Sequence, residues 1–140
     1  MGFLNSLDVS ASALTAQRMR MDVISENIAN ANTTRTENGG PYRRRVSVLQ
    51  EQPLTFSSIL NEAKGGGVVV SRIVEDQSDF EYEYDPDHPD ADANGYVALP
   101  NVDEAEEIID LMSATRSYEA NVTALNATKG MAMKALEIGR

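Results

Sequence analysis

The first 34 residues show the spacing of an amphipathic helix. Large apolar side chains recur every seven residues, at Leu7, Leu14, Met21 and Ile28, and neither Gly nor Pro interrupts residues 3–31. Side chains seven residues apart lie on one helix face, so these four positions form an apolar seam. Polar residues follow Ile28, and the Gly39-Gly40-Pro41 sequence prevents continuation. The pattern predicts a helix about 40 Å long, at 1.5 Å per residue.

The last 40 residues predict a second and longer helix. Two seven-residue rows interleave there: Leu111, Tyr118, Leu125 and Ala132 form one row, and Ile108, Thr115, Val122, Lys129 and Leu136 form the other. Their alternating spacing of three and four residues predicts an apolar seam over four heptads. We expect Asn101 to cap the start, with Glu104 three residues later in a capping-box arrangement. A helix from residue 102 to 138 would be about 55 Å long.

The segment between the helices alternates with a period of two. This alternation, bounded by Gly, Pro and Asn, predicts short strands at residues 45–51, 68–74, 80–85 and 96–99, with a loop over 54–67. The sequence assigns no role to residues 52–67. We therefore predict a mainly α fold in which the two helices pair as a coiled-coil-like bundle with a β-rich insertion. Residues 1–34 and 101–140 would form one discontinuous helical domain, and residues 35–100 a small β-rich middle module.

The helices carry more apolar surface than this middle module is expected to cover. Phe3, Val9, Val23, Ile109 and Met112 lie off the main seams and are expected to be exposed. Excess apolar surface on two thin helices indicates packing against helices of other subunits. The alternative is a closed helical adaptor that buries this surface in a dimer.

Charge excludes one large class of partners. The net charge is −10, and 14 of the 22 acidic residues lie between Ile73 and Thr115, where no Lys or Arg occurs. A nucleic-acid-binding protein needs clustered positive charge, so that function is not expected. The short basic run Arg43-Arg44-Arg45 is interpreted as the solvated face of a strand, and could meet an acidic neighbour. No cysteine is present, so thiolate chemistry is absent.

Residues 90–101 resemble the first half of a calcium-binding loop. Asp90, Asp92, Asn94 and Gly95 occupy loop positions 1, 3, 5 and 6. Position 12 should be a bidentate Glu but is Asn101, and Pro86 and Pro89 interrupt the helix that should precede the loop. We therefore favour a polar turn that leads into the C-terminal helix, and keep a calcium-responsive binding module as the alternative.

The sequence does not indicate an enzyme. His88 is the only histidine, and it lies between Asp87 and Pro89 in a polar segment with no predicted pocket around it. No phosphate-binding glycine motif occurs, because Gly65-Gly66-Gly67 lacks the Lys and Ser or Thr that such a loop requires. We expect no catalytic residue, metal, cofactor or small-molecule substrate.

Two stretches resemble a known family. "SENIANANTTRTENGGPYRRRVSVL", with its motif Asn30, Ala31, Asn32, Thr33 and Thr34, resembles the N-terminal signature of flagellar rod and hook axial proteins. "HPDADANGYVALPNVD", followed by "SATRSYEANV", resembles the flagellar basal-body proximal-rod proteins of the FlgC type. The resemblance covers nearly the whole chain and is weakest over residues 52–67.

The resemblance implies a structural subunit of the bacterial flagellar rod, located in the periplasm and required for flagellum assembly and motility. Such proteins are exported by the flagellar type III apparatus without a cleaved signal peptide, and pack their terminal helices into a tube around the export channel. The implied partners are its own copies, other proximal-rod subunits, the distal-rod protein and the hook–basal-body anchor protein of the FliE type. The expected subunit-contact residues are the seam positions Leu7, Leu14, Met21, Ile28, Ile108, Leu111, Tyr118, Val122, Leu125 and Leu136.

Overall fold

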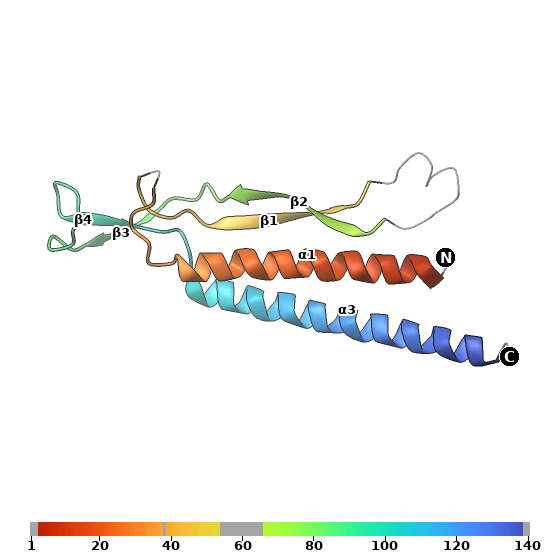
Figure 1. Cartoon of the computed structure of the whole chain (residues 1–140). Helices are drawn as coiled ribbons and strands as arrows, with labels where there is room; N and C mark the ends of the chain where they lie inside the picture. Colours follow the sequence, from red (N-terminus) through yellow and green to blue (C-terminus); the bar gives the residue numbers. More distant parts are fainter. Residues whose placement is uncertain (1–2, 38, 54–65, 139–140) are drawn as a thin grey trace.

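Two long antiparallel helices form the frame of the protein. The computed structural model describes residues 3–37, 39–53 and 66–138. Helix α1 spans Phe3–Ala29 and helix α3 spans Glu104–Ile138. They lie side by side, so the N-terminus is near the far end of α3 (Figure 1). The predicted fold class, two terminal helices around a small antiparallel β module, is confirmed. The described helices contain no segment long and apolar enough to cross a membrane.

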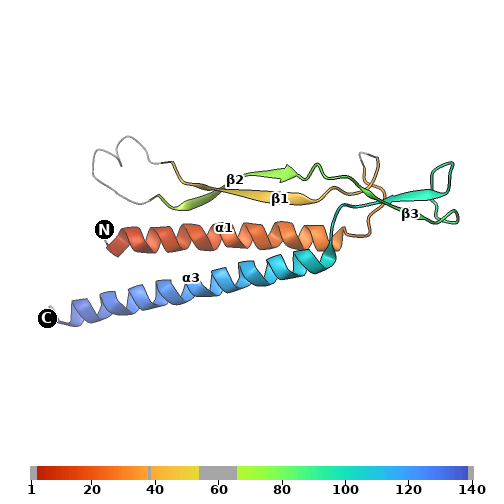
Figure 2. The same cartoon turned by 180° about the vertical axis from the view of Figure 1, so that it is seen from behind.

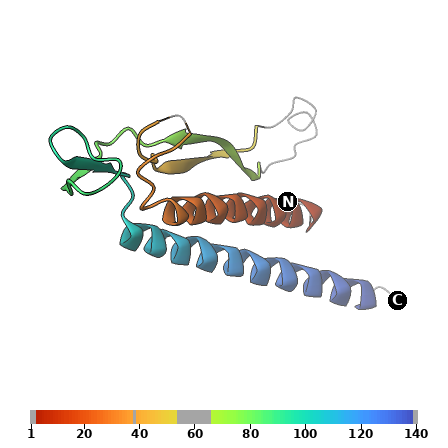
Figure 3. The same ribbon diagram turned by 60° about the vertical axis from the view of Figure 1, so that its left-hand side comes forward.

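A hairpin of two strands covers the side of α1 that faces away from α3. Strand β1 (Arg45–Glu51) pairs antiparallel with strand β2 (Val68–Glu75), and their register shifts between Val48 and Leu49. Hairpin, α1 and α3 therefore form three successive layers (Figures 1 and 3). The predicted loop over residues 54–67 lies almost entirely outside the described residues.

The hairpin approaches α1 closely at its β2 end. The hydroxyl of Ser12 accepts a hydrogen bond from the backbone N–H of Val68, at 3.1 Å. A Cβ atom at Gly67 would collide with this same hydroxyl, so the approach requires glycine there. One expectation is consequently wrong: Val23 is not exposed but only 4% accessible. The period-2 pattern indicated the strands, but it carried no information about which helix they would cover.

A second hairpin extends beyond the end of the helix pair. Strand β3 (Glu81–Tyr84) pairs with strand β4 (Tyr96–Leu99) in this hairpin (Figure 2). In their register Tyr84 lies opposite Tyr96. Gly95 completes the turn before β4 with a φ of +82°, a conformation that favours glycine. On β4 Val97 is buried, whereas every residue of β3 is exposed.

Helix α3 is longer than α1 and continues past it. The helices contain 35 and 27 residues. Their contacts align Asn27 with Glu107 and Met21 with Thr115, so the start of α1 is level with about residue 131 of α3. The remainder of α3 projects beyond the described chain around it (Figure 3). The buried apolar core is small, and its members are Ala16, Val23, Ile24, Ala31, Tyr42, Val97 and Ala114.

Candidate functional site

A buried amide joins three elements where α1 ends and α3 begins. Asn27 is 1% exposed, and its side chain makes four hydrogen bonds. The Nδ2 group donates to the carbonyl oxygen of Arg45 at 2.8 Å and to Oε2 of Glu107 at 3.0 Å. The Oδ1 atom accepts from the backbone N–H of Arg45 at 2.9 Å and from the Tyr42 hydroxyl at 3.0 Å. These bonds use the full capacity of the amide.

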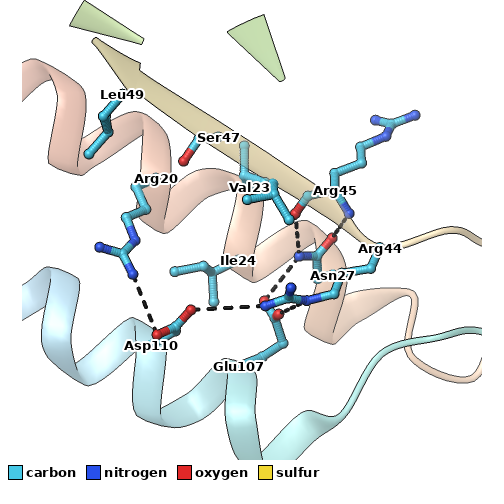
Figure 4. Close-up of a pocket in the computed structure, with 11 residues that line it drawn as sticks. Arg20, Val23, Ile24, Asn27, Arg44, Arg45, Ser47, Leu49, Glu107 and Asp110 are labelled. Atoms are coloured by element: carbon cyan, nitrogen blue, oxygen red, sulfur yellow. Dashed lines mark hydrogen bonds and ion pairs between the residues drawn. The ribbon is translucent and has the colours of Figure 1, made fainter. Parts of the chain in front are cut away.

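Glu107 and Arg44 continue this network toward the surface. Glu107 is also 1% exposed, and its Oε1 atom accepts from Nε of Arg44 at 2.6 Å (Figure 4). The Arg44 guanidinium further contacts Asp76 at 3.6 Å and Asp110 at 3.9 Å, and Asp110 also pairs with Arg20 at 3.4 Å. We call Asn27, Tyr42, Arg44, Arg45, Glu107 and Asp110 the polar cluster. The cation and the amide that bind the buried Glu107 carboxylate compensate the cost of removing its charge from water. The arrangement of the polar cluster is therefore that of a structural clamp, which holds α1, β1 and α3 together.

The polar cluster raises the pKa values of two of its members, Tyr42 and Arg44. Burial raises the pKa of the Tyr42 hydroxyl. The positive charge of Arg45 lowers this pKa, and the negative charges of Glu26 and Glu107 raise it further. For Arg44, burial disfavours the cation, but the hydrogen bond and the charge of Glu107 outweigh burial and raise its pKa. Both shifts preserve the forms that make the hydrogen bonds, a protonated phenol and a charged guanidinium.

Arg44 also corrects the interpretation of the basic run Arg43-Arg44-Arg45. Its side chain is largely buried against acidic residues of its own chain, so it is not part of a solvated face. Arg43 lies over the Phe80 ring at 4.2 Å and donates to the carbonyl oxygens of Asp76 and Ser78. These two arginines are therefore engaged within the chain.

The cap of α3 is Asp103, so the prediction of Asn101 was wrong. Oδ1 of Asp103 accepts from the backbone N–H groups of Ala105 and Glu106, at 2.8 and 3.2 Å. Asn101 instead accepts from the N–H of Arg44 at 2.8 Å and donates to the hydroxyl of Ser78 at 2.7 Å. Both residues are typical caps, and only the position of the strand beside them decides which one serves the helix.

The motif after α1 connects that helix to the rest of the fold. Asn30 donates to the Glu26 carbonyl at 2.8 Å, and its Oδ1 accepts from the Thr33 hydroxyl at 3.2 Å. Asn32 donates to Oε1 of Glu104 at 3.3 Å. Ala31 is buried, and the Thr34 hydroxyl donates to Oδ2 of Asp90 at 2.9 Å. Glu104, predicted for the capping box, thus contacts the α1 end.

The carboxylates of the calcium-like loop are engaged in other contacts. Asp90 accepts from Thr34 and lies 3.5 Å from Arg35. Oδ1 of Asp92 accepts hydrogen bonds from the backbone N–H groups of Tyr96 and Asn94. These two bonds lower the pKa of Asp92, and the bond from Tyr96 has the larger effect. In residues 3–37, 39–53 and 66–138, no three His, Cys, Asp or Glu side chains are grouped as metal ligands.

His88, the only histidine, takes part in the same turn. Its Nδ1 accepts from the backbone N–H of Asp90 at 3.1 Å.

The predicted seam positions fall into two groups. Leu7, Leu14, Met21, Ile28, Leu111, Tyr118, Val122 and Leu125 are half-buried. Met21 faces α3, because its Sδ atom accepts from the Thr115 hydroxyl at 3.6 Å, and its seven-residue row shares that face. Ile108 and Leu136 are exposed. The structure therefore brings the first group to the helix pair of one chain and leaves the other two residues in solvent.

Helix α3 has large apolar side chains on surface that no described element covers. Ile109 is 67% exposed, and six further residues of α3 are exposed: Ile108, Met112, Met131, Met133, Leu136 and Ile138. We call these seven residues the open surface of α3. Three of them lie at the start of α3 and four at its end, and uncovered apolar groups of this kind are typical of protein interfaces.

Sequence reasoning missed Asn27 and Glu107. A signal was available for Glu107, since it lies four residues before the seam residue Leu111 and so shares a helix face with it. A carboxylate at such a position predicts a buried cation nearby. Asn27, between Ile24 and Ile28, gave no comparable signal, because asparagine is also common near helix ends.

Comparisons with known proteins agree at both ends of the chain. The family model described as "Flagella basal body rod protein" matches residues 7–35, which include the Asn30–Thr34 motif. The family model described as "Flagellar basal body rod FlgEFG protein C-terminal" matches residues 93–138, which include β4 and α3.

Several curated relatives match over the full length. The chain is 61% identical to the flagellar basal-body rod protein FlgC of Bacillus subtilis, over 97% of both chains. It is 46% identical to FlgC of Borreliella burgdorferi, over 99% of this chain and 98% of the relative. It is 41% identical to FlgC of Salmonella typhimurium, over the whole of both chains.

Proposed function

Because the chain belongs to the FlgC family of flagellar basal-body rod proteins, we propose that it is a structural subunit of the bacterial flagellar rod that assembles through its terminal helices. In this role it forms part of the proximal rod, the tubular drive shaft around the export channel in the periplasm, and flagellum assembly and motility require it. It performs no catalysis.

The proposal extends to delivery and partners. The flagellar type III export apparatus delivers the chain. Its neighbours are its own copies, other proximal-rod subunits, the distal-rod protein and the hook–basal-body anchor protein of the FliE type. The helical domain of residues 1–34 and 101–140 makes the subunit contacts. Within the middle module of residues 35–100, the β1–β2 hairpin lies along α1 and the β3–β4 hairpin extends beyond the helix pair. Ile108 and Leu136, which are exposed, contact neighbouring subunits directly. The half-buried seam residues contribute indirectly, because they stabilise the helix pair that presents these contacts.

The observation that carries this proposal is the excess surface of the isolated chain. It exposes 10047 Å², whereas a compact monomer of 15.3 kDa exposes about 7,100 Å². The excess of about 2,900 Å² is within the range that permanent protein interfaces bury. Much of the large apolar part lies on the open surface of α3. A subunit that packs into a tube would cover this surface.

A substitution on the open surface of α3 tests the proposal. Ile109→Asp combined with Met112→Asp should leave the isolated chain folded, because both side chains are already in solvent. Each apolar group lost from an interface costs about 1.5–3 kcal/mol, so the two changes should weaken a subunit contact by about 100-fold or more. The double variant should fail to restore motility to a deletion strain, and electron microscopy should show membrane rings without a rod.

Ala105→Asp is the control for added charge, since it places one of the two negative charges that the double variant adds at an exposed position in the acidic first turn of α3. The control should restore swimming. Normal rods in the double variant would contradict the proposal. Light scattering would reveal the alternative, a closed dimer, as a fixed mass of two copies at every concentration.

A further inference from the structure

The second hairpin, formed by β3 and β4, does not pack against the other elements of the fold. In the described part of the chain its two strands pair with each other, but neither packs against α1, α3 or the β1–β2 hairpin. Residues 76–80 and 100–103 join it to the rest of the protein (Figures 1 and 2). An element with few packed neighbours moves easily unless specific contacts hold it. The direction of the second hairpin therefore depends on the contacts of its connecting segments and of its turn.

One attachment lies at the base of the second hairpin. Asn101 accepts a hydrogen bond from the backbone N–H of Arg44 at 2.8 Å and donates to the hydroxyl of Ser78 at 2.7 Å. Asn101 and Ser78 belong to the two connecting segments, and Arg44 directly precedes β1. Arg43 also lies over the Phe80 ring, at 4.2 Å. These contacts hold the base of the hairpin, but they do not fix the angle of the strands beyond it.

A second attachment lies away from the base, in the turn between β3 and β4. The Thr34 hydroxyl, in the segment after α1, donates to Oδ2 of Asp90 at 2.9 Å, across 56 residues of sequence. The Asp90 side chain is only 24% exposed, and hydrogen bonds to charged acceptors are among the stronger ones. Arg35 lies 3.5 Å from the same carboxylate, but its side chain is 77% exposed, so this ion pair contributes little. The main contact is therefore the hydrogen bond between Asp90 and Thr34.

The turn that carries Asp90 is firmly joined to its strands. The backbone N–H of Asp90 donates to Nδ1 of His88 at 3.1 Å, and the backbone N–H of Asp85 donates to the carbonyl oxygen of Gly95 at 3.0 Å. Asp85 directly follows β3 and Gly95 directly precedes β4. A displacement of Asp90 consequently implies a displacement of the whole hairpin.

The segment that carries Thr34 is firmly joined to the helix pair. The carbonyl oxygen of Thr33 accepts from the backbone N–H of Tyr42 at 2.9 Å, and the Tyr42 hydroxyl donates to the buried Asn27 amide of α1 at 3.0 Å. Ala31 of the same segment is buried. The hydrogen bond between Asp90 and Thr34 thus connects two parts that are each internally fixed, the second hairpin and the helix pair.

We propose that Asp90 is a positioning residue for rod assembly. Its hydrogen bond with Thr34 holds the second hairpin in one direction relative to the helix pair, and a subunit joins the rod only with the hairpin in that direction. Each strand of the hairpin has four residues and is about 13 Å long, so a change of angle at the base is amplified at the tip. A surface that is fixed before binding avoids the entropy loss of ordering it during assembly. This inference deepens the proposed function and rests on it.

Spin labels on two cysteines measure the direction of the hairpin, because the natural sequence contains no cysteine. Tyr82→Cys with Arg116→Cys, the hairpin pair, places one label on β3 and one on α3, both at exposed positions. Arg72→Cys with Arg116→Cys is the control pair, since Arg72 is exposed on β2 and the first hairpin lies along α1. Pulsed electron paramagnetic resonance on the purified full chain gives the distribution of distances for each pair.

Removal of the hydrogen bond from either side should release the hairpin. Asp90→Ala and Thr34→Val should each raise the ratio of other directions to the observed one by about 10-fold, the weight of a typical hydrogen bond to a charged group. The distance distribution of the hairpin pair should broaden, and that of the control pair should not change. Asp87→Ala is the matched control, because it removes a carboxylate from an exposed position of the same turn. Asp90→Asn keeps Oδ1 as an acceptor for the Thr34 hydroxyl, so it should preserve the narrow distribution.

The same variants, without labels, are then expressed in a deletion strain. Asp90→Ala and Thr34→Val should abolish swimming, and electron microscopy should show membrane rings without a rod. Asp90→Asn and Asp87→Ala should restore swimming, because both keep an acceptor for the Thr34 hydroxyl.

Three results would overturn the inference: an unchanged distribution of the hairpin pair in Asp90→Ala, equal broadening of both pairs, or normal rods built from Asp90→Ala. The proposed function is tested separately by Ile109→Asp with Met112→Asp, whose changes lie on α3 and leave Asp90 and Thr34 intact. Rods that form with Asp90→Ala but not with that double variant would support the proposed function and reject the positioning role.

Discussion

At the residue scale, Asn27 and Glu107 hold the two helices and β1 together. Each is almost fully buried, and each polar atom of the Asn27 amide has a partner from another element. Buried polar groups stabilise a structure only while their partners are complete, because an unpaired group retains the cost of leaving water. The polar cluster therefore favours one alignment of α1, α3 and β1 over sliding alternatives.

The first prediction concerns the Asn27 amide. Asn27→Asp keeps the shape but replaces a donor with a carboxylate 3.0 Å from Oε2 of Glu107. We expect the free energy of unfolding to fall by about 2–4 kcal/mol, measured by urea denaturation. Asn126→Asp, the same change at an exposed position of α3, should alter it by less than about 0.5 kcal/mol. Equal effects of the two changes would rule out the clamp role.

The second prediction concerns pH. The pKa of Tyr42 is raised in the fold, so the folded chain holds this proton more tightly than the unfolded chain. The stabilisation is complete below the unfolded pKa of about 10 and is lost as pH rises through the folded pKa. Tyr42→Phe should cost about 1 kcal/mol near pH 8 through loss of the Asn27 hydrogen bond. The difference in urea midpoint between wild type and variant should narrow above pH 10, and a constant difference would contradict this view.

At the element scale, neighbours decide which residue performs which task. Asp103 and Asn101 are two residues apart, and either could cap α3 by its chemistry. The chain enters β1 beside Asn101, so that amide binds Arg44 and Ser78, and Asp103 remains for the helix. Neighbours also differ between the two helices (Figure 3). Helix α1 has α3 on one side and the β1–β2 hairpin on the other, whereas α3 has α1 on one side only.

The third prediction separates these two tasks. Asp103→Ala should destabilise the start of α3 by about 1 kcal/mol, and hydrogen exchange should accelerate at the amides of Ala105 and Glu106, which it caps. Asn101→Ala should leave these two amides protected and accelerate exchange at the amide of Arg44. The reverse pattern would restore Asn101 as the cap.

At the scale of the whole molecule, order should decrease along α3. Helix α3 lies beside α1 up to about residue 131, and its last turns have no described neighbour (Figure 1). A helical segment without tertiary contacts is only marginally stable in water, because most helical stability in proteins comes from packing. The isolated subunit is thus complete at one end and incomplete at the other.

The fourth prediction follows from this gradient and uses limited trypsin digestion of the isolated chain. Cleavage after Lys129 or Lys134, both exposed on the last turns of α3, should precede cleavage after the half-buried Arg20 and Arg44. Local opening governs proteolysis, and it is easiest where few contacts must break. Mass spectrometry identifies the first products. Early cleavage at Arg20 would show that α1 opens first and would contradict this gradient.

Seven-residue and two-residue periodicities were sufficient to predict both helices and all four strands, because backbone geometry repeats with those periods. The β1 and β4 ranges agree with the structure, and β2, β3 and the helices differ by a few residues at their ends. The predictions were wrong for three residues whose side chains are compatible with two different surroundings, such as a buried and an exposed position. Val23 was expected to be exposed, Asn101 to be a cap and Arg44 to be solvated, and each is decided by a segment distant in sequence.

The amino-acid sequence by itself determined the elements, the apolar seams and the family, since these depend on local spacing and on motifs such as those around Asn30 and Asn94. Only the tertiary structure decided that the first hairpin lies on α1, that Asn27 and Glu107 meet across 80 residues, and that the second hairpin and the last described turns of α3 lie at opposite tips. These are long-range arrangements. They result from the simultaneous burial of apolar surface and pairing of buried polar groups, which no local pattern encodes.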